Sequence, residues 1–475
     1  MREHKMKHQA FAPSARRIPE LDGMRVLLVF IVSWYHIWQQ SWLTPRMGGV
    51  SLDFLVRSGY MPVDVTILLS GFLLFLPYAR TMLLGEEMPD AREFYRRRIM
   101  RVVPSYNFYT LLLLFAVALP WGLYPSAQKM VKDLFMHFTF TFTFDMETYM
   151  STPVGVASWT LAVEMQAYLL FTLLAGLALR RPAGTLCGMA AAAFAYRGYC
   201  LWAMSEYGMV VNQLPAFLDV YAVGMAGAIL YVWLVKKWQD VRRPILWQAL
   251  ATSLAALALW GLVGLLKAQA ATSGFNGIQA GQMLRRFPLA LLMVSLAVSL
   301  PFTVLPLRKL MGNRVMAFLS AISMNYYLIH QPVAVHLKRL GIPYSASELP
   351  NQAGEQPWQN QYTALCFGIS LLMAILMTYL VEKPCARLLR RWFDRRDRRR
   401  RQRYAALAGR ILREAPAEGA ICLTARRVPD ELRAALEQAV ESRAASEGPQ
   451  VALLVKRGPC GGQCDPETGF GWAWK

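Results

Sequence analysis

Hydrophobic residues recur along the first four fifths of the chain in blocks of about 20 residues, separated by short polar segments. A helix needs about 20 apolar residues to cross the ~30 Å hydrocarbon core of a bilayer. Blocks of this length lie at 24–44, 60–79, 102–120, 158–179, 185–203, 215–235, 246–266, 286–306, 314–336 and 362–381. The pattern predicts an all-α polytopic membrane protein with about ten transmembrane helices.

Lysine and arginine are unevenly divided between the segments that join these blocks. The chain of 475 residues is 55% hydrophobic and has a formal net charge of +21. Most basic residues fall on the side of the membrane that holds the N-terminus, and basic loops tend to stay in the cytoplasm. With an even number of blocks, both termini are expected in the cytoplasm of a multi-pass plasma-membrane protein. Nucleic-acid binding is disfavoured because the charge is scattered between the blocks.

The same pattern divides the chain into three parts. Residues 1–19 form a polar cytoplasmic segment that does not resemble a cleavable signal peptide, and residues 20–392 form the membrane domain. Residues 393–475 begin with a basic run suited to anionic lipid. They continue with the pattern of strand, helix and strand, which predicts a small cytoplasmic α/β appendage. Cys460 and Cys464 form an isolated C-x3-C pair without histidine, so no metal site is expected.

The first hydrophobic block carries charged and titratable residues. Arg25 and His36 are eleven residues apart, close to three helical turns, so they share one face about 16 Å apart. Asp22 lies near the same stripe, and an ion pair between Asp22 and Arg25 is expected at the cytoplasmic mouth. Such residues inside a membrane are costly and usually mark a functional site. For His36 alone, a packing role on a neighbouring helix is an equal alternative.

The fourth block carries Glu164. If that block enters from the outer face, Glu164 lies about 9 Å below this face, and His36 lies about 18 Å above the inner face. In a core of about 30 Å, the two depths nearly coincide. A carboxylate beside an imidazole fixes its tautomer and raises its basicity. The sequence therefore predicts that Glu164 orients His36 as a general base, although a structural glutamate remains possible.

Three arginines stand at the start of the third block. Arg97, Arg98 and Arg101 are followed by Pro104 and lie one turn apart. Guanidinium groups bind phosphate oxygens well, although basic residues are also common at the cytoplasmic face. A phosphorylated donor bound here could extend a thin arm of roughly 15–20 Å up to His36. Coenzyme A, with phosphates at the far end of a pantetheine arm, has this form.

These motifs together resemble the membrane acyltransferase-3 family over about residues 17–390. The matching pieces, in chain order, are LDGMR with His36 at the R-x10-H spacing, GYMPVDVTILLSGFLLF, FYRRRIMRVVP, SWTLAVEMQAYLLF, SMNYYLIHQP and VEKPCARLLRR. The resemblance implies transfer of an acyl group, usually acetyl, from cytoplasmic acyl-CoA to a hydroxyl of a carbohydrate or other cell-envelope acceptor. Many relatives also carry an extracytoplasmic esterase-like domain of the SGNH type, which this chain lacks, so a separate extracytoplasmic transferase is a possible partner.

The resemblance also implies roles for individual residues. His36 would be catalytic with Glu164 and Asp22, while Arg25, Arg97, Arg98 and Arg101 would bind the acyl-CoA donor. Three further residues would bind substrate or support the site: Asp64, Tyr327 and His330. Asp64 is also explained as a helix-start residue, and His330 ranks below His36 as a catalytic candidate. Gln166 and Ala167 stand where an aromatic residue is common in the family.

Two questions stay open at the level of sequence. His36 could deprotonate the acceptor or carry the acyl group transiently, because imidazole serves as both base and nucleophile. The polar residues could instead line a transport path for an anionic or acylated small molecule without bond chemistry. No inverted repeat supports the transport path. A third hypothesis makes the C-terminal appendage a scaffold or regulatory contact.

Overall fold

The computed structural model describes residues 13–241, 243–413, 419–424, 430–447, 451–456, 463–464 and 471–474. Residues 1–12 of the predicted N-terminal segment and Cys460 of the cysteine pair lie outside these ranges. The chain forms two compact units, Met1–Pro384 and Cys385–Lys475. The first unit corresponds closely to the predicted membrane domain, and each unit is described by itself.

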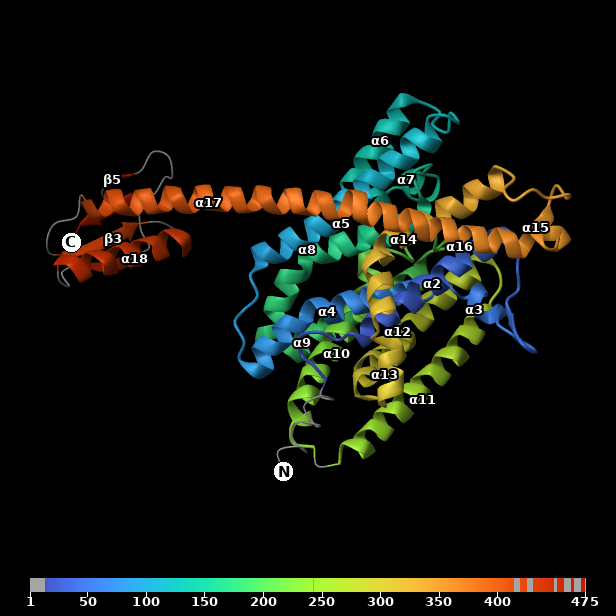
Figure 1. Ribbon diagram of the computed structural model, residues 1–475, viewed down its shortest axis with the longest axis horizontal. Coiled ribbons are helices and arrows are strands. Elements are labelled where there is room, and N and C mark those ends of the chain that lie inside the picture. Colours follow the sequence, from blue (N-terminus) through green and yellow to red (C-terminus); the bar gives the residue numbers. More distant parts are fainter. Residues whose placement is uncertain are drawn as a thin grey trace. The chain divides into compact units, whose positions relative to one another are not determined.

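Ten long helices lie among the described residues of the first unit, and each predicted block falls on one of them. Figure 1 shows how they are arranged. Their bounds are α2 Glu20–Ser41, α4 Val63–Leu84, α5 Ala91–Leu113, α8 Trp159–Arg180, α9 Pro182–Ala203, α10 Leu218–Trp238, α11 Pro244–Ala270, α12 Phe275–Ser299, α14 Arg314–Arg339 and α16 Trp358–Leu376. Shorter helices lie between them: α3 Asp53–Arg57, α6 Ala127–Phe138, α7 Met146–Met150, α13 Leu305–Met311 and α15 Pro350–Ala353. A two-stranded hairpin, β1 Arg46–Met47 with β2 Val50–Ser51, follows α2.

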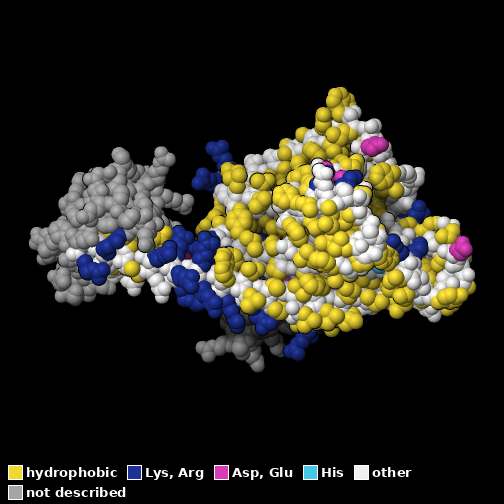
Figure 2. Space-filling view, turned by 90° about the horizontal axis from the view of Figure 1, so that it is seen from above, with side chains coloured by type: hydrophobic (Ala, Val, Ile, Leu, Met, Phe, Trp, Pro, Cys, Tyr) yellow, Lys and Arg dark blue, Asp and Glu magenta, His cyan; other side chains and the backbone are white. Residues whose placement is uncertain are grey.

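Eight helices of the described residues are long and apolar enough to cross a membrane. They contain α2, α4, α5, α8, α10, α11, α12 and α16. The two remaining long helices, α9 and α14, have 22 and 26 residues but are less apolar, since α9 holds Arg197 and α14 holds Asn325 and His330. Hydrophobic side chains cover much of the visible surface of the first unit (Figure 2), as expected for a protein whose solvent is lipid.

Several helices begin at residues whose side chains bind the free backbone N–H groups of the first turn. Asp90 accepts hydrogen bonds from the amides of Arg92 and Glu93 at the start of α5. Asn313 caps α14 in the same way through the amide of Met316. Such caps replace the missing intrahelical partners. As a result α5 begins eleven residues before the predicted third block, and its arginines lie on a helix.

The tightest helix pair of the first unit is α4 against α10. A Cβ on Gly71 would collide with the backbone carbonyl of Tyr221, and one on Gly224 would collide with the carbonyl of Leu68. Glycine at both positions therefore lets the two backbones touch, which is a common way for helices to associate in a bilayer. Phe72 and Met225 are fully buried beside this contact.

Helix α2 lies beside α14, and the two run in the same direction. Arg25 contacts Ser320, Ser33 contacts Tyr326, and the Lys338 ammonium donates to the carbonyl of Gln40. The residue numbers of the contacting partners thus differ by a nearly constant amount, between 293 and 298. Each position on α2 can therefore be matched to the position on α14 at the same depth. Three π-helical or 3-10 segments adjoin the long helices here: η1 Leu114–Ala118, η3 Val156–Ser158 and η6 Met377–Glu382.

The second unit contains α18 Asp430–Glu447 and all of α17 Lys383–Arg413 except its first two residues. Its strands are β3 Gly419–Thr424, β4 Val451–Lys456, β5 Gln463–Cys464 and β6 Gly471–Trp474, in the sheet order β4-β3-β6-β5. β3 pairs with β4 in parallel and with β6 antiparallel. Leu407 and Ile411 of α17 pack with Leu432 and Leu436 of α18.

Candidate active site

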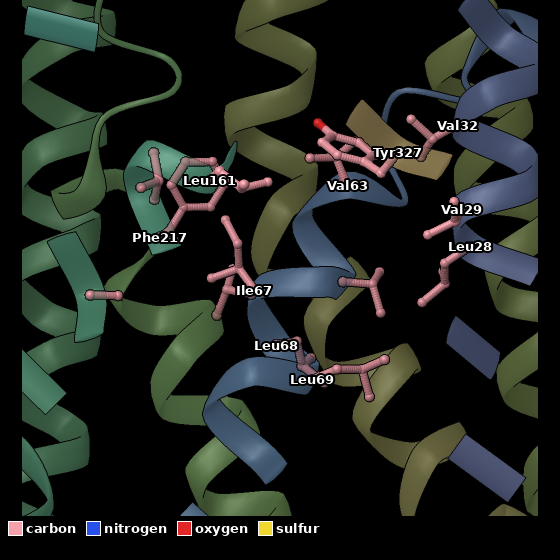
Figure 3. Packing of buried hydrophobic residues seen from close by; sticks show 14 of the residues in the cluster. Leu28, Val29, Val32, Val63, Ile67, Leu68, Leu69, Leu161, Phe217 and Tyr327 are labelled. Atoms are coloured by element: carbon pink, nitrogen blue, oxygen red, sulfur yellow. The ribbon is translucent and has the colours of Figure 1, made fainter. Parts of the chain in front are cut away.

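A cavity of about 300 Å³ lies in the middle of the first unit, between α2, α4, α5, α8 and α14. Its polar lining comprises Arg25, Thr66, Ser70, Arg98, Arg101, Thr160, Glu164, Tyr168, Ser323 and Tyr327. The apolar lining includes Val29 and Leu69, and Figure 3 labels both, Val29 on α2 and Leu69 on α4. Five of the residues predicted from the sequence thus share one cavity: Arg25, Arg98, Arg101, Glu164 and Tyr327.

Glu164 is the acidic residue of this cavity. The Ser70 hydroxyl donates to Oε1 at 3.2 Å, and the Tyr168 hydroxyl donates to Oε2 at 3.0 Å. Arg25 and Arg101 are close enough to act on its charge. Glu164 therefore has neutral hydrogen-bond donors on both oxygens and cationic groups nearby.

The predicted ion pair between Asp22 and Arg25 is not present among the described residues. Ser320 stands between them instead: its hydroxyl donates to Asp22 Oδ1 at 2.9 Å, and Arg25 Nη1 lies 3.5 Å from the same hydroxyl oxygen. Asp22 also lies 4.0 Å from Arg17. The reason is that α14 packs against this face of α2, so a serine of the neighbouring helix reaches both groups. Arg25 is consequently directed into the cavity.

The three arginines of α5 are not equivalent. Arg98 and Arg101 line the cavity, whereas Arg97 does not. Arg97 is 58% exposed and pairs with Glu93 one turn earlier at 3.5 Å. Arg101 is close enough to Glu164 and Glu382 to interact electrostatically with both carboxyl groups. Arg98 lies over the rings of Phe94 and Tyr168, at 5.9 and 5.7 Å.

Arg98 has spare hydrogen-bonding capacity. Its Nε is buried without a hydrogen-bond partner among the described residues. A buried guanidinium donor without an acceptor is costly, and a phosphate oxygen would supply the acceptor. Of the predicted donor-binding residues, Arg98 therefore has the geometry best suited to an anion in the cavity.

His36 lies outside this cavity and has partners of its own. Its Nδ1 is 2.9 Å from Oε1 of Gln39, one turn later on α2, and 3.4 Å from Nε2 of Gln331 on α14. The Gln39 amide is oriented by its Nε2, which donates to the Tyr35 hydroxyl at 2.9 Å. Since a carbonyl oxygen only accepts, the shorter contact places the proton on Nδ1 and leaves Nε2 free to accept one. His36 is half-buried.

The predicted contact between His36 and Glu164 is therefore wrong in this structure. The fourth block was expected to begin at the outer face, but α8 begins within the bundle. The Thr160 hydroxyl donates to Tyr327, the Tyr327 hydroxyl donates to the carbonyl of Ala157, and the amide of Ala157 donates to Gln331. These contacts fix the first turn of α8 against the middle of α14. Glu164 follows one turn deeper, on the side of Arg25.

The matched positions on α2 and α14 show how far Glu164 lies from His36 along the helix axis. Glu164 shares its cavity with Val29, which precedes His36 by seven residues, or about 10 Å of helix. Gln331 connects the two levels, because it accepts from Ala157 at the start of α8 and contacts His36 through its amide nitrogen. Gln39 and Gln331 were missed by the sequence analysis. The spacing His36-x-x-Gln39 was the signal that could have identified Gln39.

His330 lies beside His36, with ring centroids 5.2 Å apart. The His330 side chain is fully buried, and both ring nitrogens have no hydrogen-bond partner among the described residues. Tyr326 and Tyr327 flank its ring at 6.3 and 5.5 Å. The structure thus places His330 next to His36 and Tyr327 next to the cavity, so both lie where a supporting role is feasible.

Asp64 is in a different environment. Arg286 Nε donates to Asp64 Oδ2 at 2.8 Å, and both side chains are sealed from solvent. Nearby, Arg197 forms a two-pronged ion pair with Asp219, and Arg197 and Arg286 both donate to the carbonyl of Ala216. Asp64 does not line the cavity. This arrangement favours a structural role, and the sequence analysis missed both arginine partners because they lie on α12 and α9.

A second buried histidine belongs to a network at the start of α8. His137 of α6 lies 2.6 Å from the Tyr106 hydroxyl and 3.4 Å from Asp133. Tyr106 in turn lies 3.4 Å from the Ser158 hydroxyl, at the residue before α8. The Tyr124 and Thr152 hydroxyls both donate to Asp133. This network was also missed; His137 and Asp133 are four residues apart, which places them on one helical face.

Comparison with known proteins identifies the class of this fold and site. Residues 18–380 match the model of the Acyl_transf_3 family, described as an acyltransferase domain, and the chain belongs to this family. It is 25% identical over 413 residues to "Acyltransferase MdmB" of Streptomyces mycarofaciens, covering 80% of this chain and 94% of that protein. No solved structure matches the chain.

A further relative matches over a shorter stretch. "O-acetyltransferase OatA" of Staphylococcus aureus (strain NCTC 8325 / PS 47) is 29% identical over 178 residues, which is 35% of this chain and 26% of that protein. The chain is therefore a multi-pass membrane acyltransferase. This membership favours the enzyme over the transport path that the sequence left open.

Proposed function

We propose that this membrane acyltransferase moves an acyl group, with acetyl as the simplest case, from acyl-CoA to a hydroxyl of a carbohydrate or other cell-envelope acceptor. The single observation that supports this most is the cavity in which Arg25, Arg98 and Arg101 surround Glu164. We further propose that the chain crosses the membrane ten times, with both termini and the appendage in the cytoplasm, so that the arginines face the compartment that contains acyl-CoA.

In this proposal the donor binds with its phosphates at Arg98 and Arg101. The buried Nε of Arg98, which lacks a partner among the described residues, supports this assignment. Arg25 lies deeper along α2 and accompanies the pantetheine arm. Since the cavity reaches from these arginines to Tyr327, a thioester at its far end would lie near the level of His36.

His36 is the proposed base. Its Nε2 accepts the proton of the acceptor hydroxyl while Gln39 holds Nδ1–H. The hydroxyl oxygen then forms a bond to the acyl carbon, the carbon–sulfur bond breaks, and the thiolate takes up the proton. Glu164 acts one level below, where it keeps Arg25 and Arg101 in place through charge. In this scheme Glu164 positions the donor-binding groups and does not contact His36.

The decisive experiment uses the full chain purified in nanodiscs with acetyl-CoA and a cell-envelope glycan fraction. Release of free thiol together with esterified acceptor is expected for the wild type. His36→Ala should lose transfer by a factor of 10² or more, the usual contribution of a general base, with unchanged melting behaviour. Transfer by His36→Ala at the wild-type rate, or no thiol release by the wild type, contradicts the proposal. Formation of a labelled His36 adduct would instead indicate the acyl-carrier route.

A further inference from the structure

A second, apolar crevice of about 250 Å³ adjoins the cavity. It lies between α2, α14 and α16, and its lining includes Val26, Val29, Phe30, Ile322, Phe367 and Leu371. Val29 and Ser323 line both spaces, so the crevice and the cavity meet at these two residues. Figure 3 shows Val29 directed from α2 toward the centre of the bundle.

The chemistry of the crevice excludes a polar occupant. Among the described residues that line it, none is charged. Its two polar side chains already have partners, since the Ser323 hydroxyl donates to the carbonyl of Ser320 and the Tyr326 hydroxyl pairs with Ser33 at 3.2 Å. An apolar group is the only kind that would lose nothing on entering this space.

The far end of the crevice reaches the surface of the first unit. Phe30 is 41% exposed and Leu371 is 36% exposed, and the two belong to helices long and apolar enough to cross a membrane. The Phe30 ring stacks on Phe367 at 4.9 Å, which forms one wall. The crevice thus extends from the wall that it shares with the cavity to the surface of the first unit, and a hydrocarbon chain that fills it could continue into the bilayer.

We infer that this crevice receives the hydrocarbon chain of the acyl donor, so that the enzyme uses acyl groups longer than acetyl. The inference rests on the proposed function. With the phosphates at Arg98 and Arg101, the acyl end of the donor lies at the opposite end of the cavity. Ser323 lies one turn before Tyr327 on α14, and the chain beyond the thioester carbon folds back past Ser323 and Val29 into the crevice. The bonds formed and broken are those of the transfer itself.

The test compares acetyl-, butyryl-, hexanoyl- and octanoyl-CoA in the nanodisc assay, with thiol release as the signal. Burial of one methylene is worth about 0.8 kcal/mol, so kcat/KM should rise about fourfold per buried methylene until the crevice is full. Leu371→Trp narrows the open end without reaching the cavity. It should lower kcat/KM for octanoyl-CoA at least tenfold and leave acetyl transfer within twofold.

Leu372→Trp is the matched control, because Leu372 is the next residue of α16, is 56% exposed and does not line the crevice. This variant should keep the wild-type chain-length profile. Acetyl use with a flat or falling profile in the wild type overturns the inference alone, as does an equal effect of Leu371→Trp and Leu372→Trp. If no acyl-CoA is consumed, the proposed function fails and this inference fails with it.

Discussion

Two regions of the first unit hold charged groups at membrane depth, and they differ in how those groups are paired. Around Asp64, the carboxylates meet arginines at 2.5–2.8 Å, and the side chains are sealed by Phe217 and by backbone carbonyls. Around Glu164, the carboxylate has only hydroxyl donors, and three arginines face an open space. A charge inside a membrane protein therefore indicates function when its group lines an accessible cavity, and structure when the paired groups are sealed from solvent.

The largest expected effect on stability belongs to the sealed region. Arg286→Met leaves Asp64 buried without its partner, and breaking such a pair costs about 3–5 kcal/mol. Thermal unfolding in detergent should show a large fall in the midpoint. The double variant Asp64→Leu with Arg286→Met should recover most of it.

A matched control comes from an exposed pair. Arg57 and Asp53 lie 3.6 Å apart with 50% and 36% of their side chains exposed, and Arg57→Met should cost under about 1 kcal/mol. Equal midpoints for Arg286→Met and Arg57→Met would remove the basis for treating the two regions differently.

The next largest effect is on the KM for the acyl donor, and it should differ between two arginines of α5. Arg98→Ala should raise the KM for acyl-CoA by a factor of about 10 to 100, because a charged hydrogen bond to phosphate contributes about 1.5–3 kcal/mol. Arg97→Ala removes the same charge one residue away but outside the cavity, and should change the KM less than twofold. Initial rates at varied donor concentration measure both. A similar rise for the two variants would indicate general attraction at the surface.

Gln39 gives a smaller effect. Gln39→Ala removes the acceptor that holds Nδ1–H of His36, and loss of a neutral hydrogen bond of about 1 kcal/mol should lower kcat about fivefold.

Glu164→Gln should act mainly on the donor KM, since Glu164 lies beside the arginines and not beside His36. A pure kcat effect of Glu164→Gln would restore the predicted pairing with His36.

The smallest expected effect is on the local stability of the segment from α6 to α7, residues 127–150, called the insertion below. It concerns an exposed ion pair. Lys132 donates to Asp145 at 2.8 Å, and this hydrogen bond lowers the pKa of the Asp145 carboxyl. The folded state then binds fewer protons than the unfolded state, so the pair stabilises the insertion at neutral pH. Its contribution is lost as the pH falls through and below the ordinary Asp value of about 3.9.

Hydrogen exchange of residues 127–150, corrected for intrinsic rates, should therefore accelerate at low pH in the wild type. In Lys132→Met this additional acceleration should be absent. An identical pH response of the two proteins would show that the pair contributes nothing.

The sequence predicted the ten long helices because the spacing of apolar blocks depends on bilayer thickness alone. It also predicted five residues of the cavity lining, and three of them, Arg25, Arg98 and Arg101, lie on helices whose periodicity fixes their faces. It could not predict the level of Glu164, which depends on where α8 starts. That point is set by contacts from Tyr327 and Gln331, more than 160 residues later in the chain. For the same reason, Asp64 could not be assigned to Arg286.

The glycine contact between α4 and α10 has a consequence for substrate entry. Backbone touches backbone at Gly71 and Gly224, so at these two positions no side chain lies between the helices that could change rotamer and let them separate. Thr66 and Ser70 of the cavity lie on α4 beside this contact and form a fixed wall. Breathing motions that admit a donor must then come from the opposite wall, where α14 meets α2 and α16 through longer side chains.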